Sequence, residues 1–186
     1  MTDLFRGTWW VVSGRFLAGP SPVEMSSGAT KDNIISLIEV GTRTIVCLQE
    51  DHEPGLGAHA MPDYPGLVKQ AAFAYGADVS FYRSPVPDAT APPPEQMLEI
   101  LDIIDRSLEE DRPVYVHCQA GVGRTGTVVG CWLVRHGKNP EDALEEISRL
   151  RKGGPYMGIL PSPGTGSQVK LVRAWETLDP SIKRRP

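Results

Sequence analysis

The segment VYVHCQAGVGRTG, at residues 114–126, constrains the fold of this chain more than any other. Its first four residues favour a β-strand, Cys118 follows directly, and a glycine-rich loop leads into a helical stretch at Arg124. A strand, a tight loop and a helix N-terminus together gather backbone N–H groups around one point, which makes a site for an anion. A cysteine in that positive field is favoured as a thiolate, the nucleophilic form that attacks a phosphate ester.

The spacing of Cys118 and Arg124, C-x5-R, supports the same chemistry. Five residues let the loop curl through a half-circle, so that the guanidinium faces the sulfur and can hold two phosphate oxygens at once. Gly121 and Gly123 permit backbone angles that let the loop amides point inward. The alternative is a buried structural cysteine beside a helix-capping arginine. The segment is not a Walker loop, because it lacks G-x4-G-K-[ST].

The string HCQAGVGRTG resembles the active-site loop of the cysteine-dependent protein tyrosine and dual-specificity phosphatases. The resemblance implies that Cys118 forms a phosphocysteine intermediate and that Arg124 stabilises the transition state. It also implies that Thr125 helps the sulfur to leave and that His117 favours the thiolate through hydrogen bonding. For these two residues the alternatives are a buried, helix-capping threonine and a structural histidine. The remaining phosphate-binding residues that it implies are Gln119, Ala120, Gly121, Val122 and Gly123.

The mechanism also needs a general acid, because the leaving oxygen must be protonated. Asp88 is the best candidate, since it lies thirty residues before the cysteine, just past a predicted strand. Its segment, SPVPDATAPP, resembles the general-acid loop of the dual-specificity group, although a turn aspartate without catalytic role is the alternative. The poorer candidates, by their positions in the chain, are Asp63, Asp78, Asp102 and Asp105.

Two features later in the chain each allow a functional and a structural interpretation. Gln168 loosely resembles a glutamine that orients water in some relatives, and the alternative is a solvated residue in the first turn of a helix. The cluster Arg149, Arg151 and Lys152 is typical of a solvated helix end that favours the dipole, with substrate attraction as the alternative.

The three cysteines form no metal-binding pattern, so we expect no metal and no cofactor. Cys47 and Cys131 are predicted to pack as apolar residues. In some relatives a second cysteine forms a protective disulfide with the nucleophile, and the sequence does not choose between these two. An odd number of cysteines and the absence of a signal-peptide pattern favour a reduced, cytoplasmic location.

Strands and helices alternate along the chain, which predicts an α/β fold with a central, mostly parallel sheet flanked by helices, as in dual-specificity phosphatases. We expect one catalytic domain over 1–186, with loose ends at 1–8 and 180–186. The predicted strands are 9–17, 42–48, 79–86 and 114–117, the third with its end near an edge or exit of the sheet because of Pro85. The predicted helices are 32–41, 67–75, 95–109, 125–135, 140–150 and 168–178, and the predicted loops include 26–30 and 50–65.

The order of the acid and then C-x5-R favours the dual-specificity arrangement. We therefore expect a monomeric protein phosphatase that acts on phosphotyrosine, with phosphoserine and phosphothreonine left open, and no membrane partner. A phosphoinositide substrate is less favoured, because Gln119 and Val122 stand where lipid phosphatases tend to carry lysines. The net charge of −4 argues against nucleic acid, including an RNA 5′-triphosphate. A non-catalytic phosphopeptide-binding module would usually lack the cysteine, the arginine or the acid.

Overall fold

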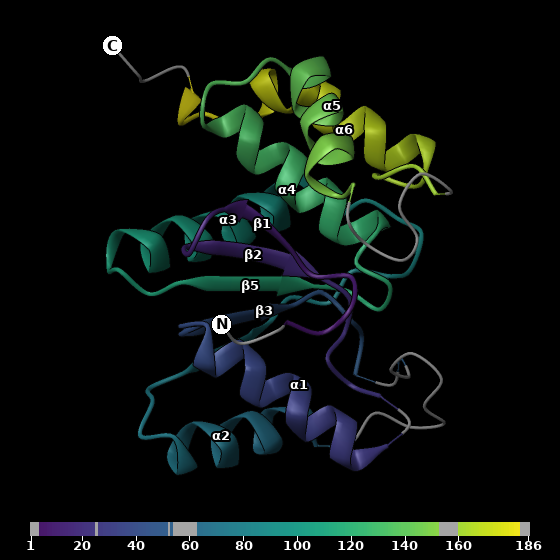
Figure 1. Cartoon of the computed structure of the whole chain (residues 1–186). Helices are drawn as coiled ribbons and strands as arrows, with labels where there is room; N and C mark the ends of the chain where they lie inside the picture. Colours follow the sequence, from purple (N-terminus) through teal and green to yellow (C-terminus); the bar gives the residue numbers. More distant parts are fainter. Residues whose placement is uncertain (1–3, 25, 52, 54–62, 153–159, 183–186) are drawn as a thin grey trace.

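In a computed structural model that describes residues 4–24, 26–51, 53, 63–152 and 160–182, five short strands form the central sheet. Their order across the sheet is β1-β2-β5-β3-β4 (Figure 1). Only β1 runs antiparallel to its neighbour, and all the other pairs are parallel. The predicted α/β class is therefore confirmed. The strands are β1 (Trp9–Val12), β2 (Phe16–Gly19), β3 (Thr44–Cys47), β4 (Ser80–Arg83) and β5 (Val114–His117).

Helices cover both faces of this sheet, with α1 and α2 on one face and α3 to α6 on the other (Figure 1). Side chains alternate along β5, so that Val114 and Val116 enter the core on the α3–α6 side, whereas Tyr115 enters the core beneath α1 and α2. Burial on both faces explains why β5 is almost wholly apolar. The helices are α1 (Ser27–Glu39), α2 (Tyr64–Ala74), α3 (Pro94–Glu109), α4 (Gly123–Arg135), α5 (Pro140–Leu150) and α6 (Gly166–Leu178).

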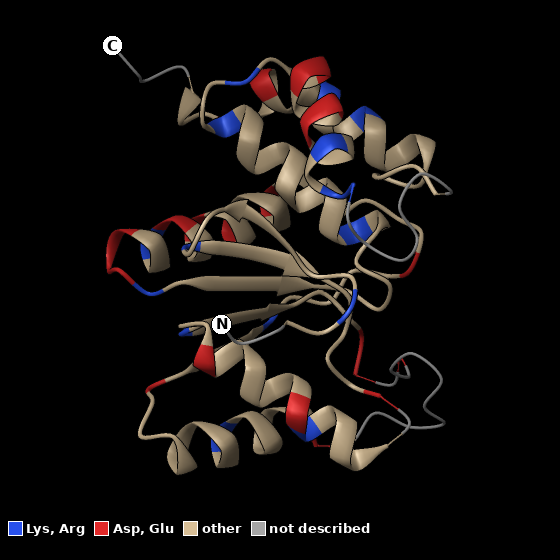
Figure 2. Ribbon diagram, in the orientation of Figure 1, with Lys and Arg blue, Asp and Glu red and all other residues tan. Residues whose placement is uncertain are grey.

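The helix α4 is central to its layer, as its nearly uncharged sequence predicts. Every residue from Arg124 to Arg135 is buried, whereas Figure 2 shows many charged residues on the neighbouring helices α3 and α5. At its end, the guanidinium of Arg135 contacts Asp179 at 2.5 Å, Asp102 at 2.7 Å and Asp105 at 3.1 Å. This cation therefore joins α4 to α3 and to the residue that follows α6.

The predicted single strand over 9–17 is wrong. The chain forms a hairpin instead, because Gly14 takes a φ of 71° and the N–H of Arg15 bonds to the carbonyl of Val12 at 3.0 Å. The predicted loop over 26–30 is also wrong, since Ser26 caps α1 by accepting a hydrogen bond from the N–H of Ala29.

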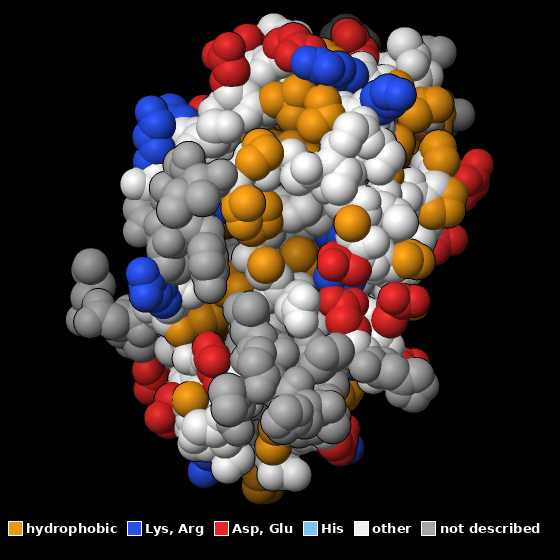
Figure 3. All heavy atoms as spheres, turned by 90° about the vertical axis from the view of Figure 1, so that its right-hand side faces the viewer, with side chains coloured by type: hydrophobic (Ala, Val, Ile, Leu, Met, Phe, Trp, Pro, Cys, Tyr) orange, Lys and Arg blue, Asp and Glu red, His pale blue; other side chains and the backbone are white. Residues whose placement is uncertain are grey.

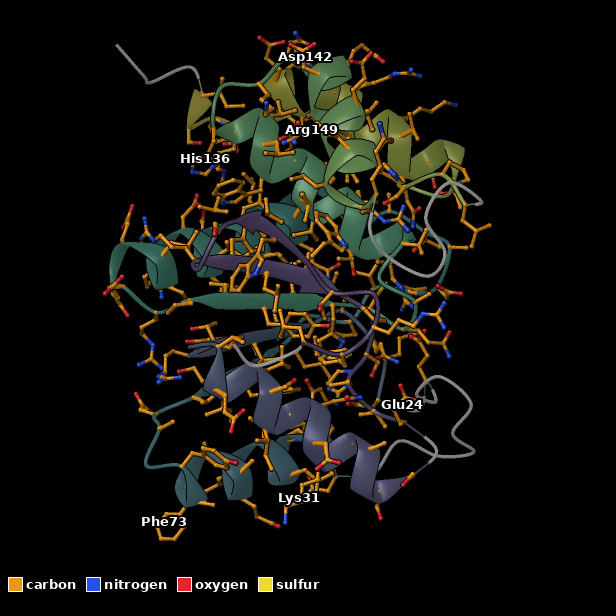
Figure 4. All side chains as sticks on the ribbon, in the orientation of Figure 1. Glu24, Lys31, Phe73, His136, Asp142 and Arg149 are labelled. Atoms are coloured by element: carbon orange, nitrogen blue, oxygen red, sulfur yellow. The ribbon has the colours of Figure 1, made fainter. Side chains whose placement is uncertain are left out.

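The helices predicted at 67–75 and 168–178 begin earlier, because Asp63 and Thr165 act as N-caps. Phe73 points away from α2 (Figure 4) and is 89% exposed, so the outer face of this helix is not packed. The strand predicted at 79–86 is shorter, as β4, and lies at the sheet edge as expected.

The ends predicted to be loose are described only in part. Phe5 packs edge-on against Tyr115, with ring centroids 6.0 Å apart. Residues 1–3 and 183–186, and most of the predicted loop over 50–65, lie outside the described residues. Within the described ranges, none of the helices combines the length and the apolar character needed to cross a bilayer.

Candidate active site

Three loops of the candidate site meet because the strands before them end at one edge of the sheet. Cys47, at the end of β3, is in register with His117 of β5 and with Arg83 of β4. The segments that follow these three residues therefore start side by side, on the right of Figure 1. The carboxyl edge of a parallel sheet is where ligands bind in open α/β folds.

The segment that follows β5 forms the expected loop, with Cys118 at its start and only 2% exposed. The helix α4 begins at Gly123, and its N-cap, Val122, makes no side-chain cap hydrogen bond. No side chain at the N-cap thus occupies the first amides of α4, as an anion site requires. The sequence placed the start of this helix two residues too late.

The loop is seated tightly on the segment that follows β2. Gly121 has a φ of 67°, and a Cβ at this residue would lie 2.4 Å from the carbonyl carbon of Gly19. The N–H of Ser21 donates to the carbonyl of Gln119 at 2.9 Å, and the hydroxyl of Tyr115 donates to the carbonyl of Pro20. Only glycine fits at residue 121 without a shift of the loop.

Arg124 turns its guanidinium back over the site and is 2% exposed. Its two terminal nitrogens contact the two oxygens of Glu53, at 2.6 and 2.5 Å. It also donates to the carbonyl of Val86 at 3.0 Å. Burial alone would lower the pKa of Arg124, but Glu53, Cys118 and Asp88 together raise it above its ordinary value. The arginine is therefore fixed as a cation.

Asp88, the predicted acid, reaches the same guanidinium. Its Oδ1 lies 2.9 Å from Nη2 of Arg124, and its side chain is 71% exposed. Its segment is a turn in which both the N–H and the hydroxyl of Thr90 donate to the carbonyl of Pro87, at 3.2 and 2.7 Å. The structure thus brings Asp88 and the cysteine loop to one place, with an exposed carboxylate above a buried cation.

The other candidate acids have structural partners elsewhere. Asp63 caps α2, and Asp78 pairs with Arg112 at 2.8 Å. Asp102 and Asp105 pair with the buried guanidinium of Arg135 at the far end of α4. None of these four is placed beside Cys118.

His117 directly precedes the cysteine in the chain, and both His117 and Thr125 are fully buried. Nδ1 of His117 lies 3.3 Å from the carbonyl oxygen of Cys118, so this nitrogen carries the proton. Burial lowers the pKa of His117 to about 3, and the imidazole is therefore neutral. The hydroxyl of Thr125 has no hydrogen-bond partner within the described part of the chain, so it caps no described group and is free to reach a ligand or the sulfur.

Two residues of this region were missed by the sequence interpretation. Glu53 has no motif, although its place soon after β3 could have suggested that it reaches the carboxyl edge. Arg151 was assigned with its neighbours to a solvated helix end, which is correct for the exposed Arg149 (Figure 4) but wrong for Arg151. Arg151 is 6% exposed and donates to the carbonyl of Leu160 at 3.4 Å, and burial lowers its pKa, against the opposing charge of Cys118.

Gln168 is fully buried, so the alternative of a solvated first-turn residue is wrong. Its Oε1 accepts hydrogen bonds from the N–H groups of Gly164 and Thr165, at 3.0 and 3.1 Å. Its Nε2 donates to the carbonyl of Thr90, two residues beyond Asp88, at 2.9 Å. The amide of Gln168 therefore contacts the acid loop, the turn from Pro87 to Thr90 that carries Asp88, directly.

Cys47 and Cys131 are free thiols with no exposed surface. Burial raises the pKa of Cys47 to about 11 and that of Cys131 well above its ordinary value. Both pack as apolar residues in this structure. Among the described residues, no group of three or more His, Cys, Asp or Glu side chains could hold a metal ion.

A parallel α/β sheet, a Cys-x5-Arg loop at its carboxyl edge and an aspartate facing that arginine define a cysteine-dependent phosphatase of the dual-specificity type. A family model supports this class over residues 19–138. The chain belongs to the family described as the DSP-PTPase phosphatase of polymorphic toxin systems.

The chain is also similar to proteins of several specificities. It is 40% identical to the mouse dual specificity protein phosphatase CDC14B over 75 residues, which cover 40% of this chain and 14% of the relative. It is 40% identical to the phosphatidylglycerophosphate phosphatase PTPMT1 of Arabidopsis thaliana over 63 residues, or 33% of this chain and 18% of that protein. The crystal structure of Tk-PTP in its active form matches with a TM-score of 0.72 and 25% identity, covering 94% of this chain and 99% of the other. The chain spans only 14% of CDC14B and 18% of PTPMT1, and it belongs to a phosphatase superfamily whose members include protein and lipid phosphatases.

Proposed function

We propose that this protein is a protein phosphatase that hydrolyses phosphotyrosine through a phosphocysteine at Cys118. The observation that carries the proposal is the contact between Asp88 and Arg124 at 2.9 Å, because it aligns a general acid with the phosphate-binding arginine. A binding module needs no exposed carboxylate at this place, since a carboxylate repels a phosphate unless it carries a proton for the leaving group.

In the first step, the thiolate of Cys118 attacks phosphorus and an S–P bond forms as the P–O bond to the leaving group breaks. Asp88 gives its proton to the leaving oxygen. The amides from Gln119 to Arg124 and the guanidinium hold the equatorial oxygens and stabilise their charge. The Nε of Arg124 is buried without a partner among the described residues, so it remains available to a phosphate oxygen.

In the second step, water attacks the phosphocysteine and gives a proton to the carboxylate of Asp88. The S–P bond breaks, inorganic phosphate forms and the electron pair returns to sulfur. The hydroxyl of Thr125, which makes no other hydrogen bond in the described part of the chain, donates to the departing sulfur. Neutral His117 holds the carbonyl of Cys118 and thereby the direction of the loop.

A protein substrate suits the charge around the site. Figure 3 shows acidic side chains near the middle of this face, whereas most Lys and Arg side chains lie at its margin. The exposed acids include Glu50, Asp51 and Asp88. The phosphate loop, residues 118–124, has no lysine. Several neighbouring phosphates, as in a phosphoinositide headgroup or an RNA 5′-triphosphate, would be repelled by these acids, whereas one phosphorylated side chain needs only Arg124 and the loop.

The test compares the turnover of one peptide sequence carrying phosphotyrosine, phosphoserine or phosphothreonine with that of phosphatidylglycerophosphate and phosphatidylinositol 5-phosphate in micelles. We expect kcat/KM for the phosphotyrosine peptide to exceed that for either lipid by at least about tenfold, or 1.4 kcal/mol. A preference for lipid, as the name of PTPMT1 implies for that relative, would overturn the substrate class but not the chemistry.

The chemistry is tested separately with an aryl phosphate. Cys118→Ser should lose activity by about 10³-fold or more, and Asp88→Asn by about 10²-fold. Cys131→Ala and Asp78→Asn are the matched controls, because neither residue lies at the site. Full activity of Cys118→Ser would contradict the proposed intermediate.

A further inference from the structure

We propose that Gln168 is a positioning residue that holds the general-acid loop in place, an inference that rests on the proposed role of Asp88. The relevant contact is the hydrogen bond from Nε2 of Gln168 to the carbonyl oxygen of Thr90, at 2.9 Å. It joins α6 to a loop 78 residues earlier in the chain.

The acid loop needs such a contact because its own geometry is strained. Ala89 has a φ of 60°, in the left-handed region that a residue with a Cβ rarely adopts, at a cost of about 1 kcal/mol or more. Thr90 closes the turn through two hydrogen bonds to the carbonyl of Pro87. Because this turn is closed around Asp88, a contact that fixes the carbonyl of Thr90 also fixes the direction of the acid.

Gln168 is itself held rigidly. Its side chain has no exposed surface, and its Oε1 accepts hydrogen bonds from two successive amides, those of Gly164 and Thr165. It also belongs to a capping box in which the hydroxyl of Thr165 accepts from the N–H of Gln168. Both lone pairs of its carbonyl are therefore used, so Oε1 has none left to accept a hydrogen bond from a catalytic water.

The same amide packs on the phosphate loop. A Cβ at Gly123 would lie 2.9 Å from Oε1 and 3.0 Å from Nε2 of Gln168, so the glycine leaves the room that the amide occupies. Beside it, the hydroxyl of Ser162 donates to the carbonyl of Val122 at 2.7 Å. The segment before α6 is thus fixed to the phosphate loop. Gln168 in turn links this segment to the loop that carries Asp88 through its hydrogen bond to the carbonyl of Thr90.

The test uses Gln168→Glu and Gln168→Met. Gln168→Glu keeps an acceptor for the two amides but places an oxygen against the carbonyl of Thr90. Gln168→Met removes every side-chain hydrogen bond of the residue while keeping nearly the same side-chain size. Lys170→Ala, an exposed change on the same helix, is the control. Thermal unfolding of each variant shows whether it remains folded at the assay temperature.

The readout is the dependence of kcat/KM on the leaving group. An acid matters most when the leaving oxygen is basic, so both Gln168 variants should lose about 10- to 100-fold with phenyl phosphate and little with 2,4-dinitrophenyl phosphate. Inhibition by inorganic phosphate should stay within about twofold, because the phosphate loop keeps its own contacts. In an Asp88→Asn background, either change at Gln168 should have no further effect.

Several results would overturn the inference. An equal loss with both leaving groups would show a general structural role, and so would an additive loss in the Asp88→Asn background. A burst of phenol with accumulation of phosphocysteine would place Gln168 in the water-dependent step instead. If kcat/KM of Asp88→Asn matched that of the wild type, the acid assignment would fail together with this inference. If Asp88→Asn lost activity but the Gln168 variants kept it, the positioning role alone would be refuted.

Discussion

Glu53 holds the guanidinium of Arg124 through both carboxylate oxygens, at 2.6 and 2.5 Å, and only 13% of its side chain is exposed. Two parallel hydrogen bonds of this kind fix the plane of the guanidinium as well as its position. The carbonyl of Val86 fixes it from another side. Arg124, the proposed phosphate-binding residue, is therefore oriented by two loops that follow different strands.

Replacing Glu53 should disturb this orientation while leaving the phosphate loop intact. A hydrogen bond to a charged group contributes about 1.5–3 kcal/mol, so we expect Glu53→Gln to lower kcat/KM for an aryl phosphate by about 10- to 100-fold. The exposed neighbour Glu50→Gln is the control. Tighter binding of inorganic phosphate to Glu53→Gln, with kcat unchanged, would instead show that Glu53 competes with phosphate for Arg124.

Alkylation of the folded protein should be confined to the active-site cysteine. Cys47 has no exposed surface and a pKa raised by burial to about 11, and Cys131 is equally buried. At pH 7, iodoacetamide should therefore add one label, detected by mass spectrometry of peptides, and vanadate should protect against it. Cys118→Ser should take up no label, and labelling of Cys47 at a similar rate would contradict this burial.

The stability of the fold should fall on mild acidification because of His117. Burial lowers the pKa of this imidazole from 6.5 to about 3. As the pH falls below 6.5, the unfolded chain therefore binds a proton that the folded protein does not bind. Between pH 7 and pH 5 this difference removes about 2 kcal/mol from the free energy of unfolding. Urea unfolding at both values should show a smaller loss for His117→Asn than for the wild type. An equal loss of stability in His117→Asn and the wild type would contradict the low pKa of the buried imidazole.

The buried pair of Arg135 and Asp179 should matter for stability rather than for chemistry. Burial alone would raise the pKa of Asp179, but hydrogen bonds from Arg135 and Ser181 lower it overall. Asp179→Asn removes the anion from Nε of the guanidinium, while Asp102 and Asp105 still pair with Nη1, so the change should cost about 1.5–3 kcal/mol, as for a hydrogen bond to a charged group. Asp102→Asn, which changes a more exposed partner of the same cation, should cost about 1 kcal/mol or less. Denaturant unfolding measures both, and similar losses would refute this ranking.

The central part of the fold could be predicted from local patterns. The strand β5, the loop after it and the buried α4 follow one another in a segment whose apolar residues and glycines specify each step. The amphipathic α3 was predicted almost to its ends for the same reason, since its apolar residues recur at helical spacing. The hairpin at Gly14 was missed because four-residue strands around a three-residue turn resemble one longer strand.

The site was predictable only where its residues lie in motifs. Cys118, Arg124 and Asp88 each have a recognisable segment, and the structure brings Asp88 and Arg124 together. Glu53 and Gln168 contact residues 71 and 78 positions away in the chain, which no local pattern encodes, although a loose resemblance singled out Gln168. The burial of Arg151 is not encoded locally either. Their roles depend on which strand ends are neighbours and on which helix packs over the phosphate loop, and both are properties of the tertiary structure.

The close seat of Gly121 on Gly19 and Pro20 has a consequence for the newly made chain. The residues of the N-terminal hairpin are synthesised before residue 121, but β2 gains its parallel partner only when β5 has been made. The loop that carries Asp88 is also synthesised before α6, which carries its hydrogen-bond partner Gln168. A chain without α6 would therefore lack the hydrogen bond from Gln168 to the carbonyl of Thr90.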